Sequence, residues 1–161
     1  MRQKVLVTRR IFDEAINLLS KFFEVETNQK DAPASPIQLI RKLQGKAGAV
    51  TLITEGIDER LLAQCPDLKA ICNVAVGYNN IDVKACTRRG IMVTNTPGIL
   101  DDTTADLTWA LLMATARRVV ESDKFLRSGK WEGWGLMQFL GHDIHHKTLG
   151  IVGLGRIGRG V

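Results

Sequence analysis

Short β-branched runs alternate with helical hydrophobic periods over the first hundred residues of the chain. Between residues 12 and 23 the apolar side chains recur at helical spacing, as on one face of an amphipathic helix. The runs at 49–54 and 68–76 are almost continuously apolar, which is typical of strands buried in a parallel sheet. Weaker patterns of the same two kinds predict strands at 5–8, 24–27 and 91–94, and helices at 36–43, 57–65 and 82–89.

Capping and turn residues separate these elements. Ser35-Pro36 is typical of a helix start, with the serine as cap and the proline at the first helical position. Gly90 and the pair Pro97-Gly98 interrupt the chain. Strands that alternate with helices indicate βαβ units, and hence an α/β fold with helices on both faces of a parallel sheet. The pattern therefore predicts one open, doubly wound domain over residues 1–98.

A different pattern follows the proline. Thr103 and Asp106 have the spacing of a capping box, which predicts a long helix from Thr103 to about Arg127. Its apolar residues cover more than one narrow face, as in a helix that packs on another domain and another subunit, or in an ordinary core helix. The aromatic-rich segment 131–140 is too irregular for a helix. It is interpreted as a loop that either docks on a partner subunit or covers the protein's own core.

Composition narrows the choice of partners. The 161 residues carry a net charge of +5, but the basic residues are dispersed in pairs, so a nucleic-acid partner is not expected. A mild excess of positive charge suits a protein that binds small anions. No apolar run approaches the roughly 20 residues that span a bilayer, so no membrane partner is expected. Cys65, Cys72 and Cys86 lack Cys-x-x-Cys spacing and are expected to be free thiols, buried or half-buried, in a reducing cytoplasm.

A glycine-rich turn near the end of the sequence indicates nucleotide chemistry. Gly153-x-Gly155-x-x-Gly158 follows the apolar run 149–152, which predicts a strand, and precedes helix-compatible residues. The first glycine makes the turn, the second admits a pyrophosphate, and the third lets the helix pack on the strand. The residue that reads the ribose is expected about 20 positions further on. Because the chain ends at Val161, we expect only the start of such a domain, in a fragment or a truncated gene product.

The loop at 73–82 is a second candidate site. It follows a predicted strand and contains Gly77, where the chain must turn. Ligands of open α/β sheets bind beyond the carboxyl ends of the strands. The loop is therefore either a ligand loop or a plain turn in which Asp82 caps the next helix.

Four segments together, 74–82, 89–98, 104–106 and 150–158, closely resemble the D-isomer-specific 2-hydroxyacid dehydrogenase family, N-terminal half only. The glyoxylate/hydroxypyruvate (2-ketoaldonate) reductase branch is the most similar. The resemblance implies a flavodoxin-like doubly wound parallel sheet as the substrate domain in 1–98. In 99–161 it implies a long helix and the first strand of a truncated Rossmann domain. NAD(P) as cofactor, a small 2-oxoacid or 2-hydroxyacid as substrate, and a homodimer packed across 130–140 follow from the same resemblance.

The resemblance also implies roles for single residues. The amides of Val76 and Gly77 would hold the substrate carboxylate, since a nest of N–H groups suits an anion, and Leu52 would line the same pocket. Arg156 would lie near a phosphate. The implied cofactor contacts are Thr104, Gly153, Leu154, Gly155, Arg156, Ile157 and Gly158. The family's catalytic Arg, Glu and His would lie downstream of Val161, so no catalytic residue is expected in this chain.

The three histidines, His142, His145 and His146, precede the fingerprint and are not candidates for the catalytic acid. They lack a carboxylate or cysteine to complete a ligand set, so no metal is expected. Two hypotheses follow. In the first, a full-length protein of roughly twice this length reduces glyoxylate or hydroxypyruvate with NAD(P)H, and this piece alone is inactive. In the second, the chain is a truncated, non-catalytic carboxylate-binding or dimerisation domain.

Overall fold

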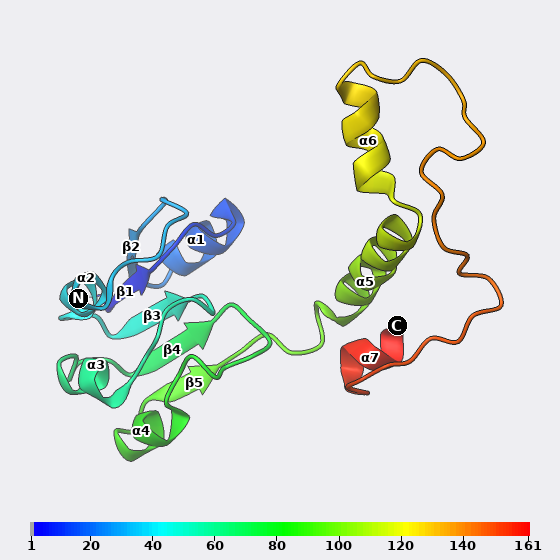
Figure 1. The fold of residues 1–161 in the computed structure, drawn as a ribbon. Helices are drawn as coiled ribbons and strands as arrows, with labels where there is room; N and C mark the ends of the chain where they lie inside the picture. The colour runs from blue at the N-terminus through cyan, green and yellow to red at the C-terminus, as the bar shows by residue number, and fades with distance from the viewer. Residues whose placement is uncertain (1) are drawn as a thin grey trace. The chain divides into compact units, whose positions relative to one another are not determined.

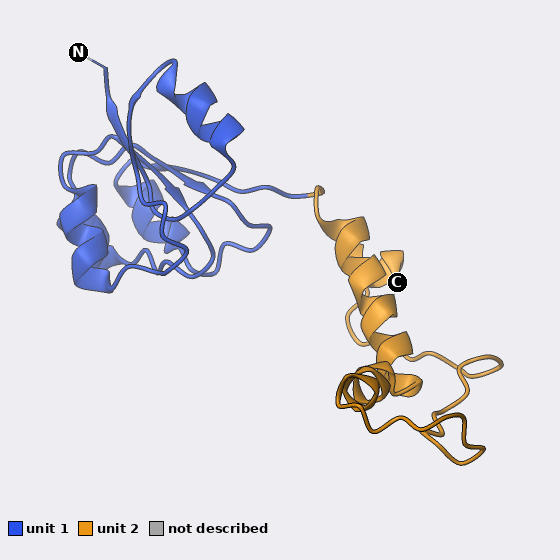
Figure 2. Ribbon diagram, turned by 90° about the horizontal axis from the view of Figure 1, so that it is seen from above, with its two compact units in different colours: residues 1–97 blue, residues 98–161 orange. Residues whose placement is uncertain are grey.

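The computed structural model describes residues 2–161, which form two compact units (Figure 2). Residues 1–97 make up unit 1 and residues 98–161 make up unit 2. The division falls at the Pro97-Gly98 pair that interrupts the sequence pattern. Among the described residues, no helix combines the length and apolarity needed to cross a membrane.

Unit 1 contains a five-stranded sheet in which every strand pairing is parallel (Figure 1). The strands run in the order β2-β1-β3-β4-β5, which is the flavodoxin-like order of a doubly wound sheet. This confirms the predicted α/β architecture. The bounds are β1 Lys4–Val7, β2 Glu24–Thr27, β3 Gly48–Thr51, β4 Ala70–Asn73 and β5 Met92–Thr94.

Three of the four helices of unit 1 begin at side-chain caps, and the sequence indicates two of these, Ser35 and Asp82. Ser35 and Gln38 form a capping box around Pro36, and the carboxylates of Asp58 and Asp82 accept backbone hydrogen bonds at the next two helix starts. Glu59 receives hydrogen bonds from the guanidinium groups of two arginines of the α4 end, which lower the pKa of its carboxyl. The helices are α1 Asp13–Ser20, α2 Pro36–Leu43, α3 Glu59–Ala63 and α4 Val83–Arg88.

The core of unit 1 lies on both faces of the sheet, because successive strand residues point to opposite sides. Leu6 and Ile71 are fully buried against α2, α3 and α4. Val5 and Val7 face the other way and pack with Val50 under α1. The sheet thus carries helices on both faces, as the βαβ pattern predicts.

Two predicted strands are shorter than their apolar runs. β3 ends at Thr51 and β4 ends at Asn73, so residues 52–54 and 74–76 lie in loops at the carboxyl edge of the sheet. The predictions of strands to 54 and 76 were wrong because hydrophobicity alone does not mark where ladder pairing stops. Beyond these strand ends, backbone groups form hydrogen bonds within turns and with asparagine side chains.

Unit 2 contains three helices, and its long segment is two helices where one was predicted. These are α5 Asp101–Ala116, α6 Val119–Arg127 and α7 Arg156–Gly160. The chain breaks at Arg118, which has a left-handed φ of 54°. The Ala116 carbonyl accepts a hydrogen bond from His142 N–H at 2.8 Å, and Arg118 lies over the Phe139 ring. Contacts from the loop that contains Phe139 and His142 therefore interrupt the helix, although its hydrophobic pattern in the sequence is continuous.

The predicted capping box at Thr103 and Asp106 is absent. α5 begins two residues earlier, and the Thr103 hydroxyl donates to the Leu100 carbonyl at 3.2 Å, as a helical side chain does. Asp101 and Asp102 occupy the first turn, where negative charge complements the helix dipole.

The predicted strand at 149–152 does not form. A strand needs a hydrogen-bonded neighbour, and every strand of residues 2–161 belongs to the sheet of unit 1. Val152 is fully exposed. The segment instead has no regular secondary structure and leads into the turn before α7.

The cysteines are free, but they differ in environment. Cys65 and Cys86 are buried in the main core, and burial raises the pKa of both thiols. Cys72 is exposed, which corrects the expectation that it is buried or half-buried. It lies on β4 between two buried residues, so its side chain points to the opposite face of the sheet.

Candidate functional site

Two loops meet at the carboxyl edge of the sheet in unit 1. The first follows β3 and contains Leu52 and Glu55, and the second follows β4 and contains Val76 and Gly77. The Ile57 N–H donates to a carbonyl of the second loop at 2.8 Å. This edge is where ligands of open α/β sheets bind.

A pair of side-chain amides, buried Asn73 and half-buried Asn80, joins the two loops. Asn73 and Asn80 exchange hydrogen bonds between their side chains, at 3.2 and 3.3 Å. Asn80 Nδ2 also donates to the Leu52 carbonyl at 3.2 Å and to the Glu55 carbonyl at 2.9 Å. Asn73 is only 1% exposed, and its Oδ1 accepts a hydrogen bond from the buried Thr51 hydroxyl. Because Asn73 Nδ2 also donates to the Gly77 carbonyl, Leu52 and Gly77 are tethered to the same pair of side chains.

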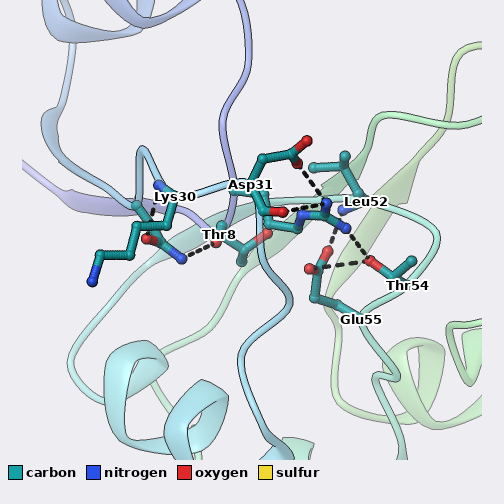
Figure 3. A network of polar contacts seen from close by, with 8 residues as sticks. Thr8, Lys30, Asp31, Leu52, Thr54 and Glu55 are labelled. Carbon is teal, nitrogen blue, oxygen red and sulfur yellow. Dashed lines mark hydrogen bonds and ion pairs between the residues drawn. The ribbon is translucent and has the colours of Figure 1, made fainter.

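Glu55 is a buried carboxylate that closes the first loop. It is 2% exposed, and its Oε2 accepts a hydrogen bond from the Leu52 N–H at 2.6 Å. The Thr54 hydroxyl donates to Oε1 and accepts from Arg9 Nη1 at 2.9 Å (Figure 3). Arg9 also forms an ion pair with Asp31. These contacts hold Leu52 at the edge of the sheet, and they occupy the carboxylate of Glu55.

The second loop presents unpaired amides. Three consecutive carbonyls, those of residues 75–77, accept hydrogen bonds from Thr96 N, Asn95 Nδ2 and Asn73 Nδ2, at 2.9, 2.8 and 2.9 Å. The N–H groups of Val76 and Gly77 donate to no group within residues 2–161. Unpaired adjacent amides at a loop form a positive concavity suited to a carboxylate.

The backbone of unit 1 does not itself require glycine at position 77. A methyl group added there would lie 3.4 Å from Asn79 Oδ1 and 3.7 Å from Ile53 Cδ1, which are ordinary contacts. The φ of Gly77 is not in the left-handed region. A reason for glycine must therefore come from what approaches the loop.

A hollow of about 940 Å³ lies in the same unit beside α2 and α3. Glu55 and Asn80 line it, but Val76 and Gly77 do not. It is therefore separate from the unpaired amides.

In unit 2, the three glycines of the turn occupy different local environments. Gly153 has a φ of 99°, which favours glycine, and a Cβ on Gly158 would lie only 2.1 Å from the Gly153 carbonyl oxygen. At Gly155 no atom lies within 4 Å of the Cβ position, so that side of the turn is open. The turn, the close packing and the open approach match the three glycine roles of the fingerprint. The residues present therefore fit a dinucleotide pyrophosphate.

α7 packs on α5 within this unit. A Cβ on Gly160 would lie 3.2 Å from that of Ala105, and the Trp109 indole N–H donates to the Val161 carbonyl at 3.0 Å. Thr104, next to Ala105, donates its hydroxyl to the Leu100 carbonyl at 2.7 Å. Thr104 and the glycine turn thus belong to one compact unit. The side chains of the turn that the sequence names as cofactor contacts, Leu154, Arg156 and Ile157, are exposed.

The candidate residues named from the sequence fall into two groups. Leu52, Val76 and Gly77 lie together in unit 1, while Thr104 and residues 153–158 lie together in unit 2. Sequence reasoning missed the polar residues that support the first group: Glu55, Asn73, Asn80 and Asn95. Only Asn95 follows a strand directly, and an asparagine there is also an ordinary turn residue.

The three histidines lie in the loop that precedes the glycine turn. The rings of His145 and His146 meet edge to face, with centroids 5.2 Å apart. Residues 2–161 contain no cluster of His, Cys, Asp and Glu that could hold a metal ion.

A family model supports the sequence resemblance. The catalytic domain of D-isomer specific 2-hydroxyacid dehydrogenases matches residues 5–135. A glyoxylate reductase from Thermococcus litoralis is 50% identical over 99% of this chain and 49% of its own length. The chain thus spans about half the length of the curated relatives it matches.

Solved structures show the same architecture. The TT0316 protein of Thermus thermophilus superposes with a TM-score of 0.92 at 38% identity, over 98% of this chain and 51% of that protein. An NADPH-dependent glyoxylate/hydroxypyruvate reductase from Sinorhizobium meliloti, solved in complex with NADP and malonate, gives a TM-score of 0.80 at 29% identity. That alignment covers 99% of this chain and 49% of the other.

Proposed function

Because the chain belongs to the D-isomer specific 2-hydroxyacid dehydrogenase family, we propose that it supplies the carboxylate site and the first part of the nucleotide site of an NAD(P)H-dependent reductase. The proposed substrates are small 2-oxoacids, glyoxylate and hydroxypyruvate, which are reduced to the 2-hydroxyacid of D configuration where the product is chiral. The observation that carries this proposal is the pair of unpaired amides at Val76 and Gly77.

The amides would bind one end of the substrate. A 2-oxoacid bears a carboxylate next to its keto carbon, so two N–H groups on the carboxylate fix the distance from the sheet edge to that carbon. Leu52, held by Glu55 and Asn80, would form the apolar wall beside it. NAD(P)H supplies the hydride that the keto carbon accepts. The keto oxygen must then receive a proton, which calls for an acid.

We assign the cofactor contacts to unit 2. The glycine turn of residues 153–158 would hold the pyrophosphate, with Arg156 close to a phosphate, and Thr104 of α5 would add a further contact. Helix N-termini favour negative charge, and α7 begins directly after Gly155. The Sinorhizobium meliloti relative was solved with NADP, which supports a nicotinamide dinucleotide as the cofactor.

We further propose that the protein is a cytoplasmic homodimer. Large apolar side chains of unit 2 are exposed on α5, on α6 and in the loop 131–140, including Leu111, Val120, Trp134 and Met137. Exposed apolar surface of this kind marks protein interfaces, and tryptophan and methionine are enriched at their centres. The three free thiols suit a reducing compartment.

Titration of the 161-residue protein with malonate and glyoxylate, followed by amide NMR, tests the carboxylate site. The resonances of Val76 and Gly77 are expected to shift most. Gly77→Ala should weaken binding at least ~10-fold, or about 1.4 kcal/mol, because its methyl would stand where the carboxylate approaches. The matched control is Gly56→Ala, whose methyl meets no atom within 4 Å. Shifts that are absent from the loop 74–80 would contradict the proposal.

The chain alone is expected to turn over no hydroxypyruvate above background. Unit 1 contains no histidine, and the three histidines of the sequence lie at 142–146, in the other unit. In the family the proton comes from a histidine beyond the glycine turn, so this step would need the rest of a longer protein. The measurement is NADPH oxidation by pure 161-residue protein. Turnover would show that a catalytic acid lies within these residues.

A further inference from the structure

The orientation of the two unpaired amides depends on the carbonyls that precede them. A trans peptide is planar, and its C=O and N–H point in opposite directions. A hydrogen bond to the carbonyl of a peptide therefore also directs the N–H of the next residue. The Val76 N–H shares a peptide with the Ala75 carbonyl, and the Gly77 N–H shares one with the Val76 carbonyl.

Both of these carbonyls are held from the segment that follows β5. The Ala75 carbonyl accepts from the backbone N–H of Thr96 at 2.9 Å. The Val76 carbonyl accepts from the side chain of Asn95, with 2.8 Å between Nδ2 and O. The first bond can form with almost any residue at 96. The second depends on the side chain at 95.

We propose that Asn95 is a positioning residue for the carboxylate site. Its Nδ2 holds the Val76 carbonyl so that the Gly77 N–H points to the substrate carboxylate. The inference rests on the proposed function of the Val76–Gly77 loop and adds to it the group that orients one of its two amides. Asn95 itself touches no substrate in this assignment.

The chemistry of the side chain supports the assignment. The Val76 carbonyl needs a donor, and an asparagine amide can donate from a short, two-torsion side chain, whereas an ionised aspartate can only accept. The Asn95 side chain is part-buried, so water competes weakly for the carbonyl. The contact also crosses from the segment after β5 to the loop after β4, which are neighbouring strands.

The test compares Asn95→Leu with Asn28→Leu in the 161-residue protein. Leucine keeps the approximate size of asparagine and removes the donor. Asn28 is the matched control, since its Nδ2 donates to the Thr8 carbonyl at 2.9 Å and is likewise part-buried, but it follows β2, an outer strand of the sheet. Each variant loses one side-chain bond to a loop carbonyl, and Asn28→Leu also loses the bond that Asn28 Oδ1 accepts from the Lys30 N–H at 3.3 Å. Asn95→Gln, which retains an amide donor, is the rescue variant.

Two readouts separate positioning from mere stability. In ligand-free protein, the NMR order parameter of the Gly77 N–H is expected to fall from about 0.85 to below about 0.6 in Asn95→Leu only. Malonate affinity should fall about 10-fold in Asn95→Leu, be partly restored in Asn95→Gln, and stay at the wild-type value in Asn28→Leu. An unchanged order parameter, or equal malonate affinity in wild type and Asn95→Leu, overturns the inference while leaving the carboxylate site in place.

Failure of the proposed function has a different result. In that case malonate and glyoxylate shift neither amide in the wild-type protein. The ligand assignment of Asn95 then falls with the site, whatever the order parameter shows.

Discussion

Replacing Asn73 by leucine is expected to lower the free energy of unfolding of residues 1–97 by about 3–5 kcal/mol. Asn73 is 1% exposed, and four hydrogen bonds pass through its side chain. Leucine is of similar size but leaves the Thr51 hydroxyl without its acceptor and the Gly77 carbonyl without its donor. A buried polar group left unpaired costs about 1–3 kcal/mol, and at least two are created.

The measurement must report on unit 1 alone. All three tryptophans, Trp109, Trp131 and Trp134, lie in unit 2, so tryptophan fluorescence would follow the other unit. Hydrogen exchange of the Leu6 and Ile71 amides, in the two strands that flank the central β3, reports unfolding of the sheet. Asn79→Leu, on the same loop but exposed, is the control and should change stability by less than about 0.5 kcal/mol. A loss below about 1 kcal/mol for Asn73→Leu would mean that water replaces the missing partners.

The fold of unit 1 could be predicted because its signals are local. The Ser35-Pro36 start, the Asp82 cap and the apolar runs each act over a few residues, and each strand predicted in this unit overlaps an observed strand. Because strands alternate with helices along the chain, only a few sheet topologies were possible.

Unit 2 was predicted less well because distant contacts decide it. The helix predicted through Arg118 is interrupted where His142, more than twenty residues away, bonds to its backbone. No residue close to Arg118 in the sequence indicates this break. The run 149–152 has the composition of a strand, but a strand forms only beside another. The hydrophobic period of a segment shows which secondary structure it can adopt. The elements that pack or pair with the segment decide whether that structure forms.

The candidate site divides in the same way. Leu52, Val76 and Gly77 could be named from the resemblance, and the loop that holds them from the position of Gly77 after a strand. Asn73 and Asn95 could not be found, because an asparagine after a strand is also an ordinary turn residue. Their partners lie 4 and 19 positions away, and only the assembled sheet brings the second pair together.

Replacing Gly158 by alanine is expected to displace α7 from α5, at a cost of about 1–3 kcal/mol. The added methyl would lie 2.1 Å from the Gly153 carbonyl oxygen, a backbone atom in a turn with a φ of 99°. The turn and α7 can relieve this contact only by moving apart. The indole N–H of Trp109 reports the event, because it donates to the Val161 carbonyl only while α7 is docked. Its NMR resonance should move to the position of a solvent-exposed indole.

Gly155→Ala separates the shape of the turn from the approach of a ligand. Its methyl meets no atom within 4 Å, so the Trp109 resonance should stay in place. Its effect is expected on the nucleotide alone: added ADP-ribose should perturb the amides of residues 154–158 in the wild-type protein and leave them unmoved in Gly155→Ala. If both variants released α7, the turn would be too strained for any side chain, and the glycine at 155 would be structural. If neither did, α7 would not depend on the close contact between Gly158 and Gly153, and the packing role of the third glycine would be wrong for this chain.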